Sequence, residues 1–548
     1  MKFKMKQLNE YNKGTADQYR EDGFKFFNTN ILKFMKDENT PLLEKINFIS
    51  IVLSNYYEHL GRAYDKDSTW IKGDLLINFI DVCMKMNQWF LEVDLSPLKN
   101  FKLDLPTMYP NRESNKDQPI LITSNMSLKY IRKNDIKNVV FDGIKNVPIT
   151  FIKDFGLELN ISKPEKMTIQ YFEESIRNMN KSYIPEIIIW INQNTPKEKI
   201  KVLWEYAQSI SHMPIFLNVD ILNCINYGAT EDENNLKYAP YQQKYLKRNY
   251  FNQSNFCEVI RVPDESFDEV IDFYDQAIHN PEVSEIYITF YRTSISGKLI
   301  DTLIKGTHLG KKINVYIEMT ARGDEENNLN LLKRFLKESD LNYLHIFRKK
   351  NKYKVHAKIG LVTLKNKKVI AHCGTGNFNE VTAKIYKDTH IITDDKNIVN
   401  NIMNTFRAID HPKGKGKVKL KKILRNEIQK EIQKGQNGKI VLVCNHIGDS
   451  EILELLKVAK VRHCEVVLLP RSTFGYPEKL FGKKVFRGGR FLEHERIYFF
   501  GKGNNPRVYL SSSDILFRNL YKRIEYTFKL PDYVDKHEFM KGIEKWLH

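Results

Sequence analysis

The second half of this 548-residue chain carries the same pattern twice, and this internal repeat constrains the fold more than any other feature. Each copy has an apolar strand, an amphipathic helix, a second apolar strand, an arginine, an H-x-K or H-x-R strand and a small-residue turn. The turn closes at Asn377, 21 residues after His356, and at Asp514, 20 residues after His494. The repeat predicts two similar domains whose histidine-bearing faces lie opposite each other across one cleft.

Strands and helices alternate within both copies. The first copy reads "EIYITFYRTS", "KLIDTLIKGTHLG" and "KINVYIEM", and the second reads "KIVLVCNHIGD", "SEILELLKVAKV" and "CEVVLLP". This order is typical of βαβ units and predicts parallel sheets. A basic helix over residues 417–435 divides the two copies.

The segment "KYKVHAKIGLV" places basic side chains at every second position. In an extended strand Lys354, His356 and Lys358 share one face, and the apolar residues share the other. Taken alone, such a segment is typical of an edge strand with a solvated face. The second copy repeats the pattern with Arg496 two residues after His494, which favours a functional role. A neutral imidazole can attack phosphorus directly, and a neighbouring Lys or Arg can neutralise the phosphoryl oxygens.

The whole chain is predicted to be a multidomain α/β protein. Residues 1–105 show helical spacing of apolar residues and predict an N-terminal helical domain, whereas 106–255 mix short strands such as "IPEIIIWI" with Asn-rich connections and predict an α+β middle domain. The two copies correspond to two α/β domains over 256–416 and 417–548.

Charge and cysteine usage limit the class of protein. The chain has 86 Lys and Arg against 67 Asp and Glu, a net charge of +19, which predicts a polyanionic partner: nucleic acid, an acidic membrane surface, a nucleotide or a phosphate polymer. Its six cysteines are scattered without a CxxC pair, which argues against a disulfide framework and a structural zinc site. No apolar run is long enough to span a membrane. We expect a cytoplasmic protein, either free or peripherally bound to a membrane.

Two H-x-[K/R] strands, each followed at a distance by Asn or Asp, resemble the phospholipase D superfamily. The resemblance implies two phospholipase D-like domains that form one active site and react through a phosphohistidine. Longer blocks resemble the polyphosphate kinase family, which elongates polyphosphate from ATP: "FYRTSISGKLIDTLI", "VYIEMTARGDEENN", "GTGNFNEVTAKIYKDTHIIT", "RFLEHERIYFFGKG" and "YLSSSDILFRNLYKRIEYTF". The N-terminal "NTPLLEKINFISIVLSNYYEHL" resembles the helical domain of that family.

This resemblance assigns roles to individual residues. It implies that His356 is the nucleophile that takes the γ-phosphoryl group of ATP and passes it to polyphosphate, with Lys358 neutralising charge. His494 would be the second active-site histidine, near the nucleotide phosphates and able to assist proton transfer; the alternative is a structural histidine on a buried strand. Tyr386 matches a tyrosine that contacts the nucleotide, and Arg471 matches an arginine that binds its phosphates.

The remaining transferred roles concern the nucleotide, magnesium and phosphate. Asn55 matches an asparagine of the nucleotide site. Arg292 and Arg322 match positions that the family associates with magnesium and phosphate; because a guanidinium cannot ligate a cation, we interpret them as clamps on phosphate oxygens beside Mg²⁺. Asp324 and Glu325 could hold the waters of that ion or simply be solvated. The implied substrates are ATP or ADP and inorganic polyphosphate; we expect a homo-oligomer and no nucleic-acid partner.

The chain also departs from the family pattern. Gly323 stands where the family has phenylalanine, and the middle section and C-terminus are shorter than usual. Glu495 follows the second histidine where a small residue is usual; on a strand it faces away from His494, so we expect the change to be tolerated.

Two alternatives remain open. One is a phospholipase D-like nuclease or phosphodiesterase that uses the same histidines on a diester, without ATP. The other is an inactive scaffold that binds a polyanion through its charge.

Overall fold

A computed structural model of the chain describes residues 238–544, with gaps at 322–323, 348–352, 411–418, 472–489 and 504, and a few short segments before residue 238. The chain divides into two compact units. The larger unit contains residues 242–548 together with 1–23 and 160–173, and the smaller contains 24–159 and 174–241. Both copies of the repeat therefore lie in the larger unit.

The smaller unit contains one described sheet. Its strands are β1 (Ile120–Thr123), β2 (Lys129–Tyr130), β3 (Ile187–Ile191) and β4 (Pro214–Asn218), in the order β2-β1-β3-β4. The predicted strand "IPEIIIWI" is confirmed as β3. The predicted N-terminal helical domain lies almost wholly outside the described residues and stays a prediction.

The first copy, called repeat 1 below, is built on one mixed sheet. Its elements are β5 (Cys257–Val262), α6 (Asp268–His279), β6 (Val283–Phe290), α7 (Lys298–His308), β7 (Lys312–Ile317), α8 (Glu325–Glu338), β8 (Leu344–Ile346), β9 (Lys354–Val355), β10 (Lys358–Leu364), β11 (Val369–Gly374), the 3₁₀ turn η5 (Thr382–Lys384), β12 (Tyr386–Thr393) and α9 (Lys396–Asp410). The sheet runs β12-β11-β10-β6-β7-β8, and β5 pairs with β12.

The second copy, called repeat 2, follows the same plan. Its elements are α10 (Lys419–Lys434), η6 (Gly435–Asn437), β13 (Lys439–Cys444), α11 (Ser450–Val461), β14 (Glu465–Pro470), β15 (Leu492–Glu493), β16 (Ile497–Phe500), β17 (Arg507–Ser511), α13 (Phe517–Lys522), β18 (Arg523–Ile524), β19 (Thr527–Lys529) and α14 (His537–Glu544). The sheet order β19-β17-β16-β13-β14 matches β12-β11-β10-β6-β7 strand for strand. The internal repeat is confirmed, and so is the basic helix between the copies, as α10.

The expectation of parallel sheets is only partly right. β6, β7 and β8 are parallel, as are β13 and β14, because helices connect the strands β6–β7, β7–β8 and β13–β14. The strands that follow each histidine run antiparallel: β10 pairs with β6 and β11, and β16 pairs with β13 and β17. The prediction was wrong for these strands. A short hairpin, closed by the Leu364 N–H···O Lys368 hydrogen bond of 2.8 Å, makes β10 and β11 antiparallel, whereas β10 reaches β6, and β16 reaches β13, only after intervening helices and strands.

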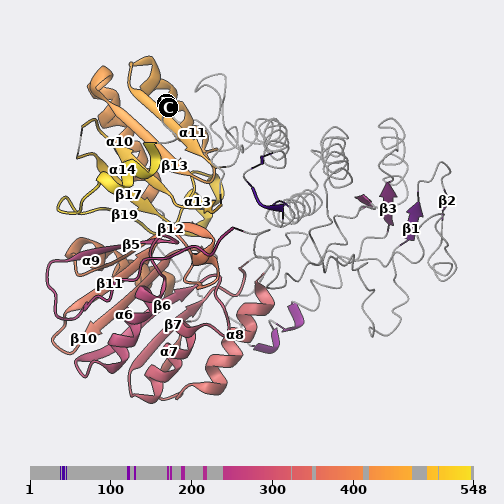
Figure 1. Cartoon of the computed structure of the whole chain (residues 1–548), viewed down its shortest axis with the longest axis vertical. Coiled ribbons are helices and arrows are strands. Elements are labelled where there is room, and N and C mark those ends of the chain that lie inside the picture. Colours follow the sequence, from indigo (N-terminus) through magenta and orange to yellow (C-terminus); the bar gives the residue numbers. More distant parts are fainter. Residues whose placement is uncertain are drawn as a thin grey trace. The chain divides into compact units, whose positions relative to one another are not determined.

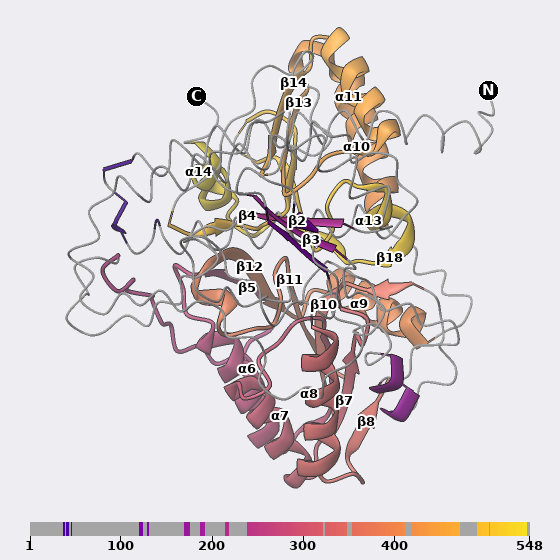
Figure 2. The same cartoon turned by 90° about the vertical axis from the view of Figure 1, so that its right-hand side faces the viewer.

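The two repeats share one apolar core. Alternate residues of β13 point to opposite faces: Val441 and Val443 join the shared core with β10, β11 and α9, whereas Ile440 and Leu442 pack under α10 and α11. Figure 1 shows repeat 2, with α10, α11 and β13, above repeat 1, with β10, β6 and α7. Figure 2 shows the paired helices α6 and α7 of repeat 1 and α10 and α11 of repeat 2. The shared core fixes the two histidine-bearing strands relative to each other.

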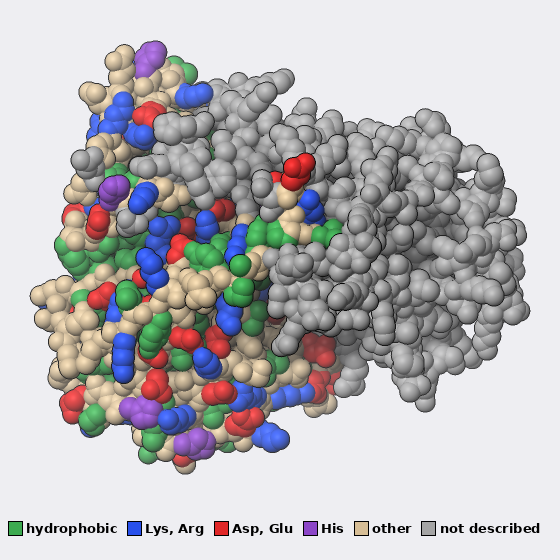
Figure 3. All heavy atoms as spheres, viewed as in Figure 1, with side chains coloured by type: hydrophobic (Ala, Val, Ile, Leu, Met, Phe, Trp, Pro, Cys, Tyr) green, Lys and Arg blue, Asp and Glu red, His purple; other side chains and the backbone are tan. Residues whose placement is uncertain are grey.

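The surface is mixed in charge. On the face seen in Figure 3, Lys and Arg side chains are interspersed with Asp and Glu over the described part of the molecule. Among the described helices, none combines the length and the apolar character that crossing a membrane requires.

Candidate active site

Each repeat lends a short strand to the other immediately before its histidine. β9 pairs in parallel with β18 of repeat 2, and the amide of His356 donates to the carbonyl of Ile524 at 2.8 Å. Reciprocally, β15 pairs in parallel with the start of β12 in repeat 1, and the amide of His494 donates to the carbonyl of Lys387 at 3.2 Å. The exchange places both histidines at the junction between the repeats.

His356 is paired with a carboxylate of repeat 2. Its Nδ1 lies 2.9 Å from Oε2 of Glu525. That carboxylate also accepts hydrogen bonds from Ser512 Oγ at 2.6 Å and from Asn519 Nδ2 at 2.8 Å. Because an ionised carboxylate only accepts, Nδ1 carries the proton and Nε2 keeps its lone pair. The arrangement leaves Nε2 as the nucleophilic nitrogen.

The surroundings keep His356 neutral. Burial lowers its pKa well below the ordinary value, and the nearby charges of Lys358 and Arg523 lower it further. Burial raises the pKa of Glu525, although Lys358 opposes this shift. A neutral imidazole next to a fixed carboxylate is the form needed for nucleophilic attack.

Lys358 lies beneath the histidine rather than on a solvated face. Its side chain is 2% exposed, and Nζ donates to the carbonyl of His356 at 2.7 Å. The ammonium lies 5.1 Å from the ring centre of Tyr291, whose edge contacts the His356 ring at a centroid distance of 4.6 Å. Burial lowers the pKa of Lys358 well below its ordinary value. The solvated edge-strand interpretation is wrong, because β10 is a central strand between β6 and β11.

His494 repeats this pairing with repeat 1. Its Nδ1 lies 2.8 and 3.0 Å from the two carboxylate oxygens of Asp388, and Thr375 Oγ1 donates to Oδ1 of Asp388 at 2.7 Å. Burial, followed by the charge of Arg496, lowers the pKa of His494 to about 4. Burial alone would raise the pKa of Asp388, but the contacts with His494 and Arg496 lower it. The second histidine is therefore also neutral and oriented.

Arg496, the basic residue two positions after His494, is held by more polar contacts than Lys358. Arg496 makes a two-pronged contact with Asp514, with Nε–Oδ1 at 3.1 Å and Nη2–Oδ2 at 3.2 Å. Its Nη1 lies 3.2 Å from Nε2 of His494. The pair holds the pKa of Asp514 well below its usual range, although burial opposes the shift. Of the guanidinium nitrogens, Nη1 faces the histidine, while Nε and Nη2 are engaged with Asp514.

The expected nucleotide residues gather around His494. The Tyr386 ring lies 5.1 Å from the His494 ring, and Arg471 Nε donates to Asn445 Oδ1 at 2.8 Å. The backbone N–H of Asn445 in turn donates to Oδ1 of Asp514 at 2.9 Å. Tyr386 and Arg471 thus belong to one network with the second histidine.

Of the two predicted phosphate clamps, Arg292 lies beside Tyr291, whose ring contacts that of His356. Its Nε pairs with Asp324 Oδ2 at 2.6 Å, and its guanidinium lies 5.9 Å from the ring centre of Tyr291. Glu325 is buried in the first turn of α8. Arg322, Gly323 and Asn55 lie outside the described residues. Within the described part of the chain, no group of three or more His, Cys, Asp or Glu could hold a metal ion.

Sequence reasoning missed the two carboxylates that orient the histidines. Asp388 and Glu525 each follow the closing residue of the turn, Asn377 or Asp514, by 11 positions. This equal spacing was a usable signal. It would still not have shown that each carboxylate serves the histidine of the other repeat.

Comparison with known proteins places these features in one family. Residues 252–415 match the model of polyphosphate kinase C-terminal domain 1, and 415–548 match that of polyphosphate kinase C-terminal domain 2. A polyphosphate kinase from Yersinia pestis is 32% identical over 88% of this chain and 72% of its own length. One from Staphylococcus epidermidis is 26% identical over 94% of this chain and 84% of its own length.

A solved structure shares the fold. The crystal structure of polyphosphate kinase from Porphyromonas gingivalis matches 96% of this chain and 92% of its own, with a TM-score of 0.65 and 20% identity.

Proposed function

Because the chain belongs to the polyphosphate kinase family, we propose that it transfers the γ-phosphoryl group of ATP reversibly to inorganic polyphosphate through a phosphohistidine at His356. The observation that carries the proposal is the reciprocal pairing of His356 with Glu525 and of His494 with Asp388. Two oriented, neutral imidazoles with cations beside them suit phosphoryl transfer by double displacement.

In the first step, Nε2 of His356 attacks the γ-phosphorus, an N–P bond forms, and the bond from phosphorus to the leaving oxygen of ADP breaks. Glu525 accepts the Nδ1–H hydrogen bond and stabilises positive charge on the ring. Lys358 faces the phosphoryl oxygens, whose negative charge favours its protonated form. In the second step, a terminal oxygen of polyphosphate attacks the phosphorus, the N–P bond breaks, and His356 is regenerated.

The His494 half would hold the nucleotide. The ring of Tyr386 offers a face for adenine, and the guanidinium of Arg471 suits contact with the phosphates. His494 would then lie near the leaving oxygen, where it can pass a proton. We assign Asn55 to the nucleotide site and Arg322 to the phosphate site on the family resemblance alone.

Magnesium would enter with the nucleotide. We propose that the ion is bound mainly by phosphate oxygens and water, as is usual for Mg²⁺ at nucleotide sites. When bound, the ion neutralises charge on the transferred group. Asp324, which forms an ion pair with Arg292, would hold one of its waters. Arg292 would clamp a phosphate oxygen.

The domain organisation, oligomeric state and location are also proposed from the family resemblance. We propose a helical domain over 1–105, a middle domain over 106–255, and two phospholipase D-like domains over 256–416 and 417–548 that form one active site. We further propose a homo-oligomer in the cytoplasm, free or peripherally bound to a membrane.

The test is incubation with γ-labelled ATP, Mg²⁺ and a short polyphosphate primer, with the products resolved on a gel. The wild type should give a polyphosphate ladder and a labelled protein, and both should vanish in His356→Ala. Cleavage of a phosphodiester without ATP would indicate a nuclease or phosphodiesterase instead. Binding of polyphosphate without turnover would indicate a scaffold. Phosphohistidine formation that survives in His356→Ala would exclude this nucleophile.

A further inference from the structure

Three consecutive residues of β12, 387–389, contact residues 493–495. Residues 492–495, which are β15 and the two residues after it, are called the β15 segment below. Asp388 pairs with His494, as described, on the side of the active site. The flanking contacts lie on the opposite side: Lys387 Nζ to Glu493 Oε1 at 3.0 Å, and Thr389 Oγ1 donating to Glu495 Oε2 at 2.9 Å. The catalytic pair is thus held between two polar contacts that face away from it.

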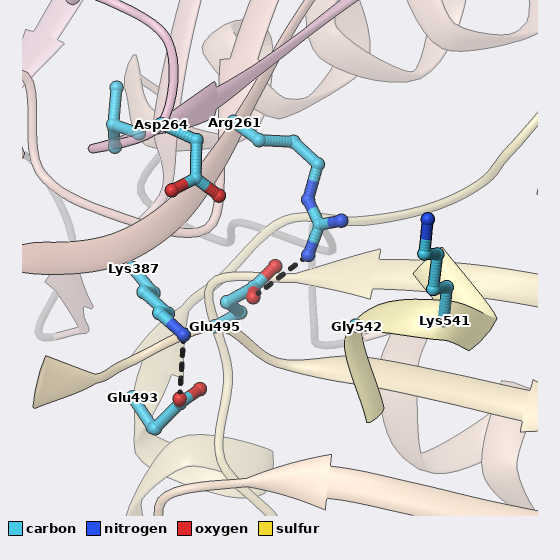
Figure 4. Close-up of a pocket in the computed structure, with 8 residues that line it drawn as sticks. Arg261, Asp264, Lys387, Glu493, Glu495, Lys541 and Gly542 are labelled. Carbon is cyan, nitrogen blue, oxygen red and sulfur yellow. Dashed lines mark hydrogen bonds and ion pairs between the residues drawn. The ribbon is translucent and has the colours of Figure 1, made fainter. Parts of the chain in front are cut away.

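These flanking contacts border a cavity behind the active site. The cavity has a volume of about 290 Å³, and its charged lining consists of Arg261, Asp264, Lys387, Glu493, Glu495 and Lys541. Figure 4 shows the Arg261 guanidinium extending from β5 to Glu495, and Lys387 reaching Glu493. The Arg261 Nη2–Glu495 Oε1 distance is 3.4 Å. Glu495 is therefore fixed from two sides by repeat 1.

The other histidine has no such polar backing. At the equivalent positions, Val355 and Ala357 of repeat 1 and Ile524 and Tyr526 of repeat 2 are all buried in the shared apolar core. Packing of several apolar side chains holds that strand crossing in place. At His494 the strand crossing is held instead by individual hydrogen bonds and ion pairs. Of these, the Thr389–Glu495 hydrogen bond is more buried than the Lys387–Glu493 ion pair.

We propose that Glu495 is a positioning residue for His494: its carboxylate, held by Thr389 and Arg261, keeps the β15 segment in the register that pairs His494 with Asp388. Glu495 itself faces away from the reacting groups and touches neither substrate nor nucleophile. Thr389 is 0% exposed, and Glu495 is its only described side-chain partner for Oγ1, so removal of the carboxylate leaves a buried hydroxyl unpaired. The nearest way to relieve that loss is a shift of the strand crossing, which carries His494 with it.

Three variants separate the parts of this contact. Glu495→Ala removes the contacts with both Thr389 and Arg261, Thr389→Val removes only the hydroxyl, and Glu495→Gln keeps an oxygen that accepts from Thr389. We expect about a tenfold lower kcat for Glu495→Ala and Thr389→Val, with a smaller change in KM for ATP, and a loss below about threefold for Glu495→Gln. The double variant Glu495→Ala/Thr389→Val should be no slower than Glu495→Ala, because Glu495→Ala has already removed the hydrogen bond that Thr389→Val removes. Glu465→Gln, which breaks an exposed ion pair with Lys439 elsewhere in repeat 2, is the matched control and should keep wild-type kcat.

A second readout does not depend on turnover. The His494 ring is followed by NMR of histidine-labelled protein, with its signal assigned from a His494→Gln sample. The charged and titratable groups that face this ring are Asp388, Arg496, Arg471 and His356, with the ring of Tyr386. In Glu495→Ala we expect the titration midpoint of His494 to rise toward that of an exposed histidine, because water enters the loosened crossing; Glu495→Gln should stay at the wild-type midpoint.

The outcomes are distinct. The inference rests on the proposed function only where kcat is measured. If the wild-type protein gives no polyphosphate ladder, the proposed function is refuted, but the titration of His494 still tests the role of Glu495. A wild-type titration of His494 in Glu495→Ala would overturn the inference, even if kcat fell, because the effect would then be general destabilisation. If Glu495→Ala does not fold, Thr389→Val and Glu495→Gln carry the test: a changed titration in Thr389→Val but not in Glu495→Gln supports it, and equal behaviour overturns it.

Discussion

Nδ1 of His356 lies 2.9 Å from Oε2 of Glu525, although 169 positions separate the two residues and they belong to different repeats. His494 and Asp388, 106 positions apart, have the reciprocal relationship. Each of these two histidines is therefore paired with a carboxylate of the other repeat. The duplicated fold produces its site only when the two copies exchange strands.

Replacing Glu525 tests the orientation of the nucleophile. In Glu525→Gln the charge is lost, and the amide can present its NH₂ to Nδ1, which would move the ring proton to Nε2 and block attack. We expect phosphohistidine formation to slow by about 10²-fold or more, with a smaller change in KM for ATP. Rapid-quench measurement of labelled protein checks this. Ser512→Ala, which removes only one donor to the same oxygen, should cost less than about tenfold; an equal loss in both would argue against a tautomer effect.

The Arg496–Asp514 pair can be compared with its counterpart in repeat 1, where Lys358 and Asn377 stand at the same points of the pattern. Asp514→Asn would leave a guanidinium that is 3% exposed without its counter-charge, so we expect about 3–5 kcal/mol loss in the free energy of unfolding. Adding Arg496→Lys reproduces the composition of repeat 1 and should recover part of that loss. Urea denaturation of both single variants and the double variant measures the coupling. Strictly additive losses would contradict a specific pair.

Local sequence pattern was sufficient to predict the repeat. The order of strands and helices and the position of His356 and His494 follow from hydrophobic periodicity and spacing, and both repeats have the same strand order in the structure. The predicted parallel direction is confirmed for β6, β7 and β8 and for β13 and β14. It was wrong for the strands that follow each histidine, because periodicity shows that a segment is a strand but not which neighbour it pairs with.

The exchange of strands was beyond local pattern. It depends on the amides of His356 and Ala357, which both donate to the carbonyl of Ile524, at 2.8 and 2.9 Å. This contact interrupts the strand between β9 and β10, so the simple alternation of faces ends there. Lys358 is buried because the central strand β10 begins at this residue, directly after the interruption.

Buried histidines should make the protein sensitive to acid. Burial lowers the pKa of His390 and of His494 to about 4, and it also lowers that of His356 and His372. Between about pH 6.5 and 4 the unfolded chain binds protons that the folded chain does not, so the free energy of unfolding falls as pH falls. Each of the two histidines with a pKa of about 4 contributes up to about 3 kcal/mol over this range.

Carboxylates modify the same curve. Asp388 and Asp514, whose pKa values are lowered, add stability above their unfolded pKa that is lost at still lower pH. Glu525, whose pKa is raised, acts in the opposite direction. Urea midpoints at pH 7.5 and 5.0 check the sign: the midpoint should drop at pH 5.0, and by less in His390→Leu. The exposed His308→Gln, which changes no buried group, serves as the control. A urea midpoint that does not change with pH would contradict the conclusion that these histidine rings are buried in their neutral form.

Gly376, in the turn that precedes Asn377, allows Asp388 to approach the backbone. A Cβ atom at this position would collide with the Asp388 carboxylate, whose oxygens must stay in contact with His494 and Thr375. Because Asp388 is buried and cannot turn aside, Gly376→Ala should lower the free energy of unfolding by about 1–3 kcal/mol and reduce phosphoryl transfer by about tenfold or more. Adding Asp388→Ser shortens the obstructing side chain, so the double variant should regain stability but not activity. Denaturation and the labelled-ATP assay on the two proteins separate these effects: recovery of activity together with stability would mean that the carboxylate of Asp388 is not needed to orient His494.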